Sequence, residues 1–368
     1  MPGKSVKNVP MSTQTTGESI SLASLTSLGV GGHAGRFVCV TDRTSLQVEV
    51  RQARAQNSRI YLLGGGSNLV VADEGVNGTV VQVAIKGQTI LEETAEGIRI
   101  RVNAGEVWDD FVAHAVNNQW AGVECMSGIP GWVGAAPIQN IGAYGQEVAS
   151  VIEQVEVLDL NTGRFENYSN SECQFSYRSS AFKKNKATPK AVVSVTFKLK
   201  KKNEGLVQYR DLQADFASSG QAPELQHVRD AVLRIRGNKS MLLEDKDPNG
   251  QSAGSFFTNP ILDEEGRTQL LQKTEGAPPI YPYGDRYKTS AAWLIEQAGF
   301  EKGFALGAAA LSSKHTLAIT NQGNASSAEI VHLAKVIQAK VWDRWQILLI
   351  PEPQFWGFDP HPLMEQAP

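Results

Sequence analysis

The stretch SAGSFFTNP, residues 252–260, places a single hydroxyl, Ser255, between a glycine and two phenylalanines. An ordinary serine is a poor acid, but in a pocket closed to water it can pass a proton to a strongly basic carbanion. A second interpretation stays open, because a serine just before an Asn-Pro turn commonly hydrogen-bonds its own backbone. The elements around Ser255 must decide between a proton donor and a turn residue.

Two glycine-rich stretches could hold a ligand with their backbone. LGGGSNLVV, residues 63–71, can turn N–H groups toward phosphate oxygens, although a tight turn between two strands explains it equally well. SGIPGWVGAAPIQNIGAYGQE, residues 127–147, is too apolar for a linker and too rich in glycine and proline for a helix. It suits backbone laid along a flat apolar ligand, and a buried irregular loop is the alternative of equal weight.

A third cluster, GVGGHA at residues 29–34, has the spacing of a dinucleotide-binding fingerprint. That fingerprint requires a helix directly after the glycines. The segment that follows, RFVCV at 36–40, is β-branched and typical of a strand. We therefore reject a dinucleotide-binding fold of this kind.

Composition limits the class of protein. A chain of 368 residues is too long for one compact core, so two or three domains are expected. The net charge of −3 does not favour nucleic acid or an anionic membrane as partner. Three scattered cysteines argue against a disulfide framework and against a metal site. Because no signal peptide or transmembrane run is visible, we predict a cytoplasmic protein with a disordered leader over residues 1–20.

Hydrophobic periodicity predicts a chain of mixed helices and strands, with a domain boundary near residue 205 at the polar run KLKKKNEG. A capping box of Ser326 and Glu329 marks the start of the last helix. The expected strands are 36–40, 60–66, 79–85, 98–105, 155–160, 191–199 and 347–355, and the expected helices are 44–58, 107–120, 223–236, 290–300 and 329–345.

Five motifs occur in the order typical of one family. LGGGSN, GIPGWVGAAPIQNIGAYG, YRSSAFK (177–183), AGSFFTNP and PEP (351–353) resemble those of the UDP-N-acetylenolpyruvoylglucosamine reductases, also called UDP-N-acetylmuramate dehydrogenases. The resemblance covers about residues 20–357, and VQYRDL (207–212) is similar to the substrate-loop segment of the family's first type. One departure is Gln354, since the family often has arginine two residues after its glutamate.

The resemblance implies an α+β fold with an FAD-binding domain of the vanillyl-alcohol-oxidase kind. This domain would span 21–205 in two subdomains with a break near 86. An α+β substrate-binding domain would span 206–346, and a C-terminal strand and tail, 347–368, would return to the active site. The resemblance also implies FAD and NADPH as cofactors, a UDP-sugar as substrate, and peptidoglycan precursor synthesis in the cytoplasm as the setting; protein partners are left unidentified.

The resemblance also assigns site residues. The implied catalytic residues are Arg178, Ser255 and Glu352, with no metal. The implied FAD-binding residues are Gly64, Gly65, Gly66, Ser67, Asn68, Ile129, Gly131, Ala136, Pro137, Ile141, Gly142 and Arg178. The implied substrate-binding residues are Tyr209, Lys239, Asn259, Gln297 and Lys288.

The family's substrate is an enol ether that carries a carboxylate. Hydride arrives at its terminal methylene carbon, and negative charge then spreads from the neighbouring carbon into the carboxylate. Arg178 would hold this charge, since a preorganised cationic donor can supply roughly 3–4 kcal/mol. Glu352 fits beside the charge only as an acid, and Ser255 would give the proton.

Two rival hypotheses remain. One is a flavin oxidase of the same broad fold, many of which bind FAD covalently through His or Cys; His33 and Cys39 lie in the wrong context for that bond. The other is a catalytically silent flavin or nucleotide carrier. The joint presence of Arg178, Ser255 and Glu352 argues against a carrier.

Overall fold

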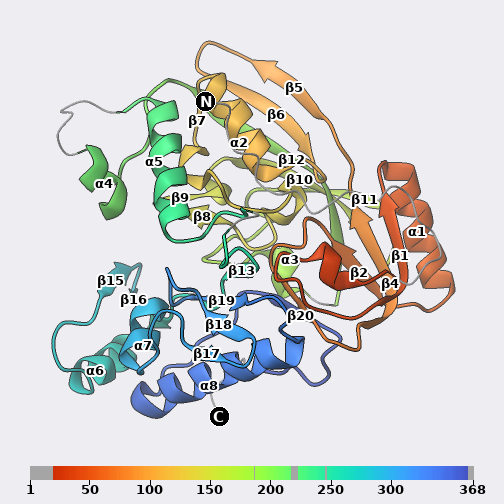
Figure 1. Cartoon of the computed structure of the whole chain (residues 1–368). Helices are drawn as coiled ribbons and strands as arrows, with labels where there is room; N and C mark the ends of the chain where they lie inside the picture. The colour runs from red at the N-terminus through yellow and green to blue at the C-terminus, as the bar shows by residue number, and fades with distance from the viewer. Residues whose placement is uncertain (1–19, 186, 217–222, 245–246, 364–368) are drawn as a thin grey trace. The chain divides into compact units, whose positions relative to one another are not determined.

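The computed structural model describes residues 20–185, 187–216, 223–244 and 247–363, which form two compact units (Figure 1). Unit 1 contains residues 34–66 and 77–244 with Ile20, and unit 2 contains 21–33, 67–76 and the chain from 245 onward. Except for Ile20, the expected leader lies outside the described residues. Residues 206–244 pack in unit 1, whereas the sequence places a boundary near 205.

Unit 1 begins with a small sheet and one helix. The strands are β1 (Ala34–Val40), β4 (Val76–Val83) and β2 (Ile60–Leu63), in the order β1-β4-β2, with β2 and β4 parallel. Helix α1 (Arg43–Ala55) starts at Asp42, whose side chain accepts the N–H of Ser45 at 2.8 Å. The strand predicted after the glycine cluster GVGGHA is β1.

The larger sheet of unit 1 is antiparallel, in the order β11-β10-β12-β6-β5, with β7 beside β12. Its core includes a stacked pair, Phe111 of helix α2 (Trp108–Asn117) and Phe197, whose ring centroids are 4.7 Å apart. The apolar stripe of α2 is buried throughout; it consists of Trp108, Phe111, Val112, Ala115 and Val116. The strands are β5 (Gln88–Glu93), β6 (Gly97–Asn103), β7 (Trp120–Ala121), β10 (Ile152–Asp159), β11 (Phe165–Ser169) and β12 (Lys190–Lys201).

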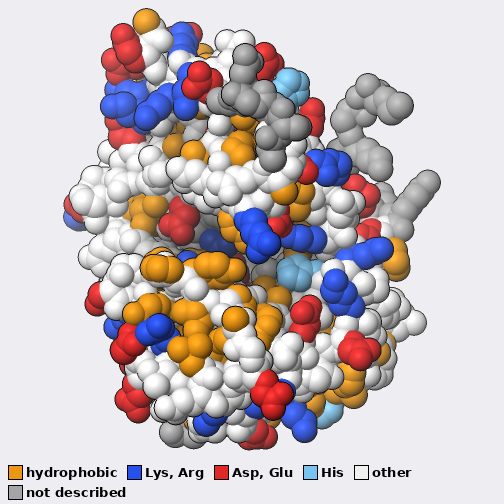
Figure 2. Space-filling view, turned by 90° about the vertical axis from the view of Figure 1, so that its left-hand side faces the viewer, with side chains coloured by type: hydrophobic (Ala, Val, Ile, Leu, Met, Phe, Trp, Pro, Cys, Tyr) orange, Lys and Arg blue, Asp and Glu red, His pale blue; other side chains and the backbone are white. Residues whose placement is uncertain are grey.

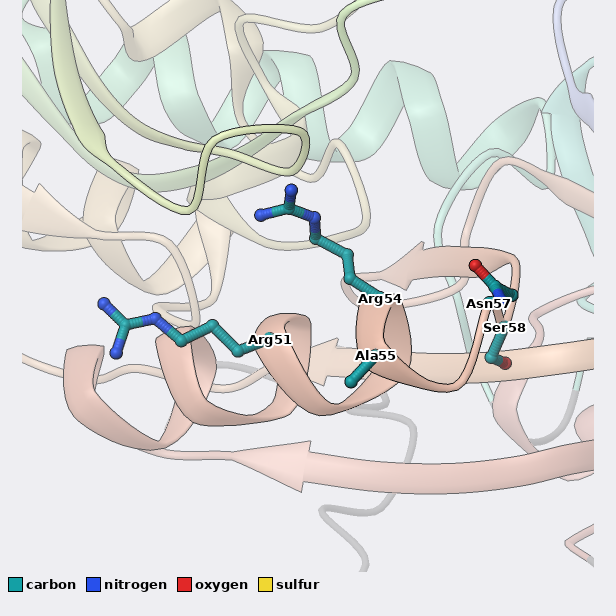
Figure 3. Close-up of a pocket in the computed structure, with 5 residues that line it drawn as sticks. All are labelled: Arg51, Arg54, Ala55, Asn57 and Ser58. Atoms are coloured by element: carbon teal, nitrogen blue, oxygen red, sulfur yellow. The ribbon is translucent and has the colours of Figure 1, made fainter.

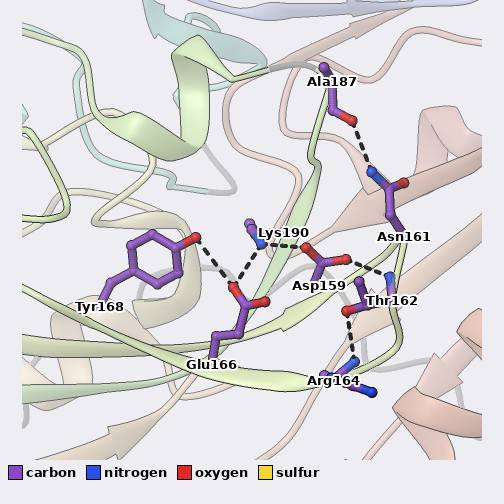
Figure 4. A network of polar contacts seen from close by, with 8 residues as sticks. All are labelled: Asp159, Asn161, Thr162, Arg164, Glu166, Tyr168, Ala187 and Lys190. Atoms are coloured by element: carbon purple, nitrogen blue, oxygen red, sulfur yellow. Dashed lines mark hydrogen bonds and ion pairs between the residues drawn. The ribbon is translucent and has the colours of Figure 1, made fainter.

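A buried ion-pair network links three strands of this sheet (Figure 4). The ammonium of Lys190 contacts the carboxylate of Asp159 and lies 2.8 Å from Glu166, whose carboxylate also accepts the hydroxyl of Tyr168. The Lys190 and Asp159 side chains are 9% and 6% exposed. Burial alone raises the pKa of Asp159, but hydrogen bonds from Lys190 and Thr162 bring this pKa below its ordinary value.

The glycine-rich stretch 127–147 forms neither a long helix nor a long strand. It contains the 3₁₀ turn η3 (Val133–Ala135) and the two-residue strands β8 (Gly142–Ala143) and β9 (Gln146–Glu147). The other short elements and helices of unit 1 are η2 (Glu124–Met126), η4 (Val148–Ser150), α3 (Ala181–Lys184), α4 (Arg210–Phe216) and α5 (Leu225–Asn238).

Unit 2 contains three small sheets and one long helix (Figure 1). The antiparallel sheets have the orders β13-β19-β18-β17 and β14-β16-β15, and β3 pairs with β20 in parallel. The strands are β3 (Leu69–Val71), β13 (Ser252–Ser255), β14 (Ile261–Leu262), β15 (Ile280–Tyr283), β16 (Arg286–Thr289), β17 (Ala305–Leu306), β18 (Ala309–Leu311), β19 (Ala318–Asn321) and β20 (Gln354–Trp356). The helices are η1 (Leu22–Leu25), α6 (Glu264–Gln272), α7 (Ala291–Gln297) and α8 (Ser327–Trp345).

Helix α8 starts as the sequence predicts. Ser326 and Glu329 form the capping box, and the carboxylate of Asp73 accepts the N–H groups of Ser327 and Ala328 at 2.8 and 3.2 Å. The strand expected over 347–355 is shorter: only Gln354–Trp356 forms a strand, because prolines at 351 and 353 have no N–H to donate, and Pro351 makes an isolated bridge to Phe257.

The surface carries charges of both signs. Acidic and basic side chains are interspersed on the face drawn in Figure 2. A hollow at the C-terminal end of α1 is lined by Arg51, Arg54, Ala55, Asn57 and Ser58 (Figure 3). It contains none of the predicted site residues, so we assign it no part in the reaction.

Among the described residues, no helix has the length and apolar character needed to cross a membrane.

Candidate active site

Two of the predicted cofactor segments lie against each other within unit 1. A Cβ on Gly65 would lie 3.1 Å from the Cα of Gly131 and 3.1 Å from the ring of Trp132. Gly131 has a φ of 107°, a conformation that side-chain-bearing residues rarely adopt. Gly64 precedes this contact at the end of β2. The structure thus brings LGGG and GIPGW together, as a site built from both requires.

The apolar members of the second segment pack into unit 1. Ala136 and Pro137 are buried, and Ile129 and Ile141 are half-buried against the core under the large sheet. Gly142 is needed for the protein's own packing, because a Cβ there would lie 2.6 Å from the carbonyl oxygen of Gln146.

Arg178 reaches this second segment from a tight turn. Its Nη2 donates to the carbonyl of Gly142 at 2.8 Å and its Nη1 to that of Asn140 at 3.3 Å. Arg178 has a φ of 51°, a left-handed conformation that costs an ordinary residue about 1–2 kcal/mol. Such strain is typical of residues held in place for function. The structure therefore joins the predicted catalytic arginine to the predicted cofactor segment.

Further hydrogen bonds fasten the Arg178 turn to the same segment. The Asn140 side chain donates to the carbonyl of Ser176 at 3.1 Å, and the Ser180 hydroxyl donates to that of Ile138 at 2.7 Å. Asn140 and Ser180 are both buried. The stretch 138–142 and the turn that carries Arg178 are therefore joined by several hydrogen bonds.

The sequence reasoning missed an ion pair that holds the start of this segment. Asp109 on α2 accepts the N–H of Gly128 at 2.6 Å and binds Arg229 on α5 through both oxygens, at 2.6 and 2.8 Å. Gly128 has a φ of 70°, and a Cβ there would strike Leu242. The charged pair thus fixes the backbone of Gly128. Asp109 and Arg229 are 120 residues apart in the sequence, so no local sequence motif predicts their contact.

A second missed residue, Glu124, organises the opposite edge of the same region. Its buried carboxylate accepts the N–H of Gly122 at 2.7 Å, the amide of Gln146 at 2.8 Å and the N–H of Leu206 at 3.1 Å. Leu206 begins the segment that leads to Tyr209. One carboxylate therefore connects the cofactor segment to the predicted substrate segment.

In unit 2 the backbone that carries Ser255 runs beside the backbone that carries Glu352. Ser255 ends β13, and the carbonyl of the next residue, Phe256, accepts the N–H of Glu352 at 2.9 Å. The N–H of Thr258 donates to the carbonyl of Ile350 at 2.9 Å, so the backbone segments 256–258 and 350–352 run side by side. Both Ser255 and Glu352 are half-buried. Ser255 and Glu352 thus belong to neighbouring backbone segments joined by main-chain hydrogen bonds.

Asn68, a predicted cofactor residue, forms hydrogen bonds with the segment that carries Glu352. Its side-chain amide donates to the carbonyl of Glu352 at 3.3 Å, and its carbonyl accepts the N–H of Gln354 at 3.1 Å. Gly66 ends the unit 1 part of LGGGSN, and Ser67 and Asn68 belong to unit 2. Gln354, which replaces the family's frequent arginine, is exposed on β20.

The residues around Ser255 match only part of the prediction. Gly254 has a φ of 70°, and a Cβ on it would meet no atom within 4 Å, so space is open beside Ser255. Phe256 and Phe257 do not line that space: both lie in the hydrophobic core of unit 2, with their ring centroids 5.3 Å apart. The two phenylalanines anchor the chain directly after β13 in the core, and Ser255 is the last residue of that strand.

Two of the predicted substrate residues lie in unit 1. Tyr209 is 48% exposed, and its ring meets Tyr144 edge to face at 5.5 Å. Lys239 pairs with Asp211 at 2.8 Å. Burial alone lowers the pKa of Lys239, but the hydrogen bond to Asp211 raises it above its ordinary value, so the ammonium stays charged.

The other three predicted substrate residues, Asn259, Lys288 and Gln297, lie in unit 2. The side-chain oxygen of Asn259 accepts the N–H of Ala291 at the start of α7, and the Lys288 ammonium lies 4.2 Å from the ring centre of Tyr283. Thr289 donates to Pro260, so Asn259 and Lys288 belong to one neighbourhood. Gln297 sits at the other end of α7, where it is exposed.

Comparisons with known proteins cover most of the chain. Residues 246–356 match the family model described as UDP-N-acetylenolpyruvoylglucosamine reductase, C-terminal domain, and residues 34–169 match an FAD binding domain. The reductase of that name from Thermobifida fusca is 44% identical over 354 residues, which cover 94% of this chain and 99% of the relative. The one from Salinispora arenicola is 44% identical over 359 residues, with 95% and 98% covered.

The chain belongs to the UDP-N-acetylenolpyruvoylglucosamine reductase family. A crystal structure of the reductase from Thermus caldophilus has a TM-score of 0.63 to this fold, at 28% identity, and the match covers 93% of this chain and 99% of that one. The α+β fold class and the family resemblance are thereby confirmed. As a member of this family with an FAD binding domain, the protein is a flavin-dependent oxidoreductase.

The residues of unit 1 fit FAD. Among the described residues, Nε of Arg236 is buried without a hydrogen-bond partner, and it would lie 3.3 Å from a Cβ on Gly128. A buried cationic donor beside glycine backbone suits an anionic or electron-rich ligand. No group of three or more His, Cys, Asp or Glu side chains is placed to hold a metal ion in the part of the chain that the structure describes.

Proposed function

We propose that this protein reduces UDP-N-acetyl-enolpyruvoylglucosamine to UDP-N-acetylmuramate in the cytoplasm, with NADPH as electron donor and FAD as carrier, as a step of peptidoglycan precursor synthesis. The observation that carries the proposal is the 2.9 Å bond from the Glu352 N–H to the Phe256 carbonyl, which holds the segment that carries Glu352 beside the segment that carries Ser255. A carbanion beside a carboxylate requires both a proton and charge stabilisation, and this pair of side chains can supply them.

Each catalytic residue then has one task. When bound, FAD supplies the transfer of hydride from NADPH to the methylene carbon of the substrate. Arg178 binds the substrate carboxylate and stabilises the negative charge that spreads into it. Glu352, in its protonated form, adds a hydrogen bond to that charge. The Ser255 hydroxyl gives its proton to the carbon next to the carboxylate, and the open space at Gly254 admits the reacting group.

The remaining predicted residues bind the two ligands. Tyr209 would offer its exposed ring and hydroxyl to the uridine diphosphate, and Lys239 its charge to a phosphate. Asn259, Gln297 and Lys288 are the other residues that we propose for binding the UDP-sugar. For FAD we propose the backbone of Gly64–Asn68 and of Ile129–Gly142, with Arg178 holding the second stretch in place.

A visible spectrum of the purified protein, followed by anaerobic addition of NADPH, tests the proposal. We expect flavin bands that bleach with NADPH and return when the enolpyruvyl UDP-sugar is added without oxygen. An oxidase would instead recover its colour only with oxygen. A fully folded protein that neither carries flavin nor binds added FAD would overturn the proposal.

A further inference from the structure

Lys183 lies beneath the turn that carries Arg178. It is the third residue of α3, a single turn capped by the hydroxyl of Ser180. Its Nζ donates to the backbone carbonyl of Arg178 at 3.1 Å and lies 3.4 Å from the side-chain oxygen of Gln139. The Lys183 ammonium therefore contacts both the strained turn and the predicted cofactor segment.

The backbone of the turn determines where the guanidinium can point. Ser176 and Ser179 exchange two hydrogen bonds, at 3.0 and 3.1 Å, so Tyr177 and Arg178 occupy its two central positions. A non-glycine residue with a φ of 51° stays in that conformation only where its neighbours hold it there. Of the contacts described above, the one from Lys183 acts on the backbone of Arg178 itself.

We propose that Lys183 is a positioning residue for Arg178. By binding the Arg178 carbonyl and the Gln139 side chain together, its ammonium sets the direction in which the guanidinium leaves the turn. The inference rests on the proposed function, in which Arg178 binds the substrate carboxylate. Loss of Lys183 should leave the cofactor segment attached, because the bonds of Asn140 and Ser180 to the turn remain.

The variant that tests this role is Lys183→Met, which keeps the length of the side chain and removes its donor. A misdirected catalytic group costs about 10–100-fold in rate, so reoxidation of reduced flavin by the enolpyruvyl UDP-sugar should slow by that factor. Reduction of the flavin by NADPH should keep its rate, because Arg178 has no part in it. Stopped-flow absorbance follows each half-reaction, and a FAD titration with a melting curve reports on cofactor binding and folding.

Two further variants act as controls. Lys184→Met changes the neighbouring exposed lysine of the same helix and should behave as the parent in both half-reactions. Lys183→Arg restores a cationic donor and should recover part of the lost rate. If Lys183→Met does not purify, Lys183→Gln, which keeps an uncharged donor, takes its place in the same measurements.

The outcomes separate the inference from the function on which it rests. A selective loss in substrate reoxidation, with FAD affinity and melting temperature unchanged, supports the positioning role. Equal loss in both halves together with lost FAD would show a purely structural lysine and overturn the inference, as would parent-like rates. If the parent protein itself shows no NADPH bleaching, it is the proposed function that fails.

Discussion

At the scale of single residues, a serine becomes a useful acid only where its proton has one destination and water is kept away. Ser255 stands at the end of a strand, with core packing behind it and open space at Gly254 beside it. The alternative of a mere turn residue is weakened by this placement, because Ser255 belongs to strand β13 and is paired with Ala318 in β19.

Ser255→Ala should therefore separate the two half-reactions. Flavin reduction by NADPH should keep its rate, because no proton from Ser255 enters it. Reoxidation by the enolpyruvyl substrate should fall by about 10²–10⁴-fold, the contribution of a positioned acid. Ser255→Cys should regain part of the loss, since a thiol is an acid of similar size. Stopped-flow absorbance of the flavin band measures both steps, and equal slowing of both would return Ser255 to a packing role.

At the scale of elements, the charged contacts between helices and loops decide how firmly the site is held. Asp109 on α2 and Arg229 on α5 clamp the first residue of the cofactor segment, Gly128. A hydrogen bond to a charged group contributes about 1.5–3 kcal/mol, more than one apolar contact along the same loop. The two helices thus set the position of backbone that neither of them contains.

We expect Asp109→Asn to weaken FAD binding by about tenfold, because an amide cannot hold both Arg229 and the Gly128 N–H as a carboxylate does. Fluorescence titration of the apoprotein with FAD gives the dissociation constant. Asp110→Asn is the matched control, since Asp110 is the exposed neighbour on the same helix. The same affinity in both variants would show that the pair stabilises the helices alone.

The Lys190 network should make stability depend on pH. The pKa of Asp159 is lowered in the folded protein, so its stabilising effect is present above the unfolded value and is lost as pH falls through the folded one. Lys190→Met should cost about 3 kcal/mol at pH 7, where it leaves a buried carboxylate unpaired, and less in acid, where that carboxylate is protonated.

Urea unfolding of the Lys190 variant at neutral and acid pH, beside Lys198→Met on the exposed face of the same strand, measures this difference. A loss of stability that stays constant with pH would mean that the cost lies in packing and not in charge.

Elements with regular periodicity could be predicted from the sequence, and the bonds between them could not. The apolar stripes of α2 and α5 and the capping box of α8 follow from local patterns, and all three are confirmed. The strand over 347–350 was wrong, because the apolar run ILLI fits a strand but finds no partner strand. Asp109, Glu124 and Lys183 escaped notice, since a carboxylate or an ammonium gains its role from a partner distant in sequence. The motif residues could be named only through the family resemblance.

At the scale of the whole molecule, neither unit is one continuous piece of chain. Unit 2 takes strand β3, the helix-capping Asp73 and the core residues Leu28 and Val30 from the first 76 residues, although most of it lies after residue 245. The stretch matched by the C-terminal family model, 246–356, therefore lacks parts of its own core.

Residues 245–368 produced alone should fail to fold cooperatively. The fragment has no partner for β20, and its hydrophobic core lacks Leu28, Val30 and Val70, whose absence costs several kcal/mol by the usual cost of emptied core sites. Near-ultraviolet circular dichroism during heating should show no sharp transition. Co-expression with residues 1–244 is the control and should restore one. A sharp transition of the lone fragment would contradict this account.

The parallel pairing of β3 with β20 also affects when this part of the protein can fold during its synthesis. Translation delivers β3 long before β20, and the hydrogen bonds between Asn68 and residues Glu352 and Gln354 cannot form until β20 has been made. A ribosome that stops before residue 352 releases a chain that lacks Glu352, the proposed acid, and in which β3 has no partner strand. Such a chain also lacks the backbone N–H that binds the carbonyl of Phe256, next to Ser255.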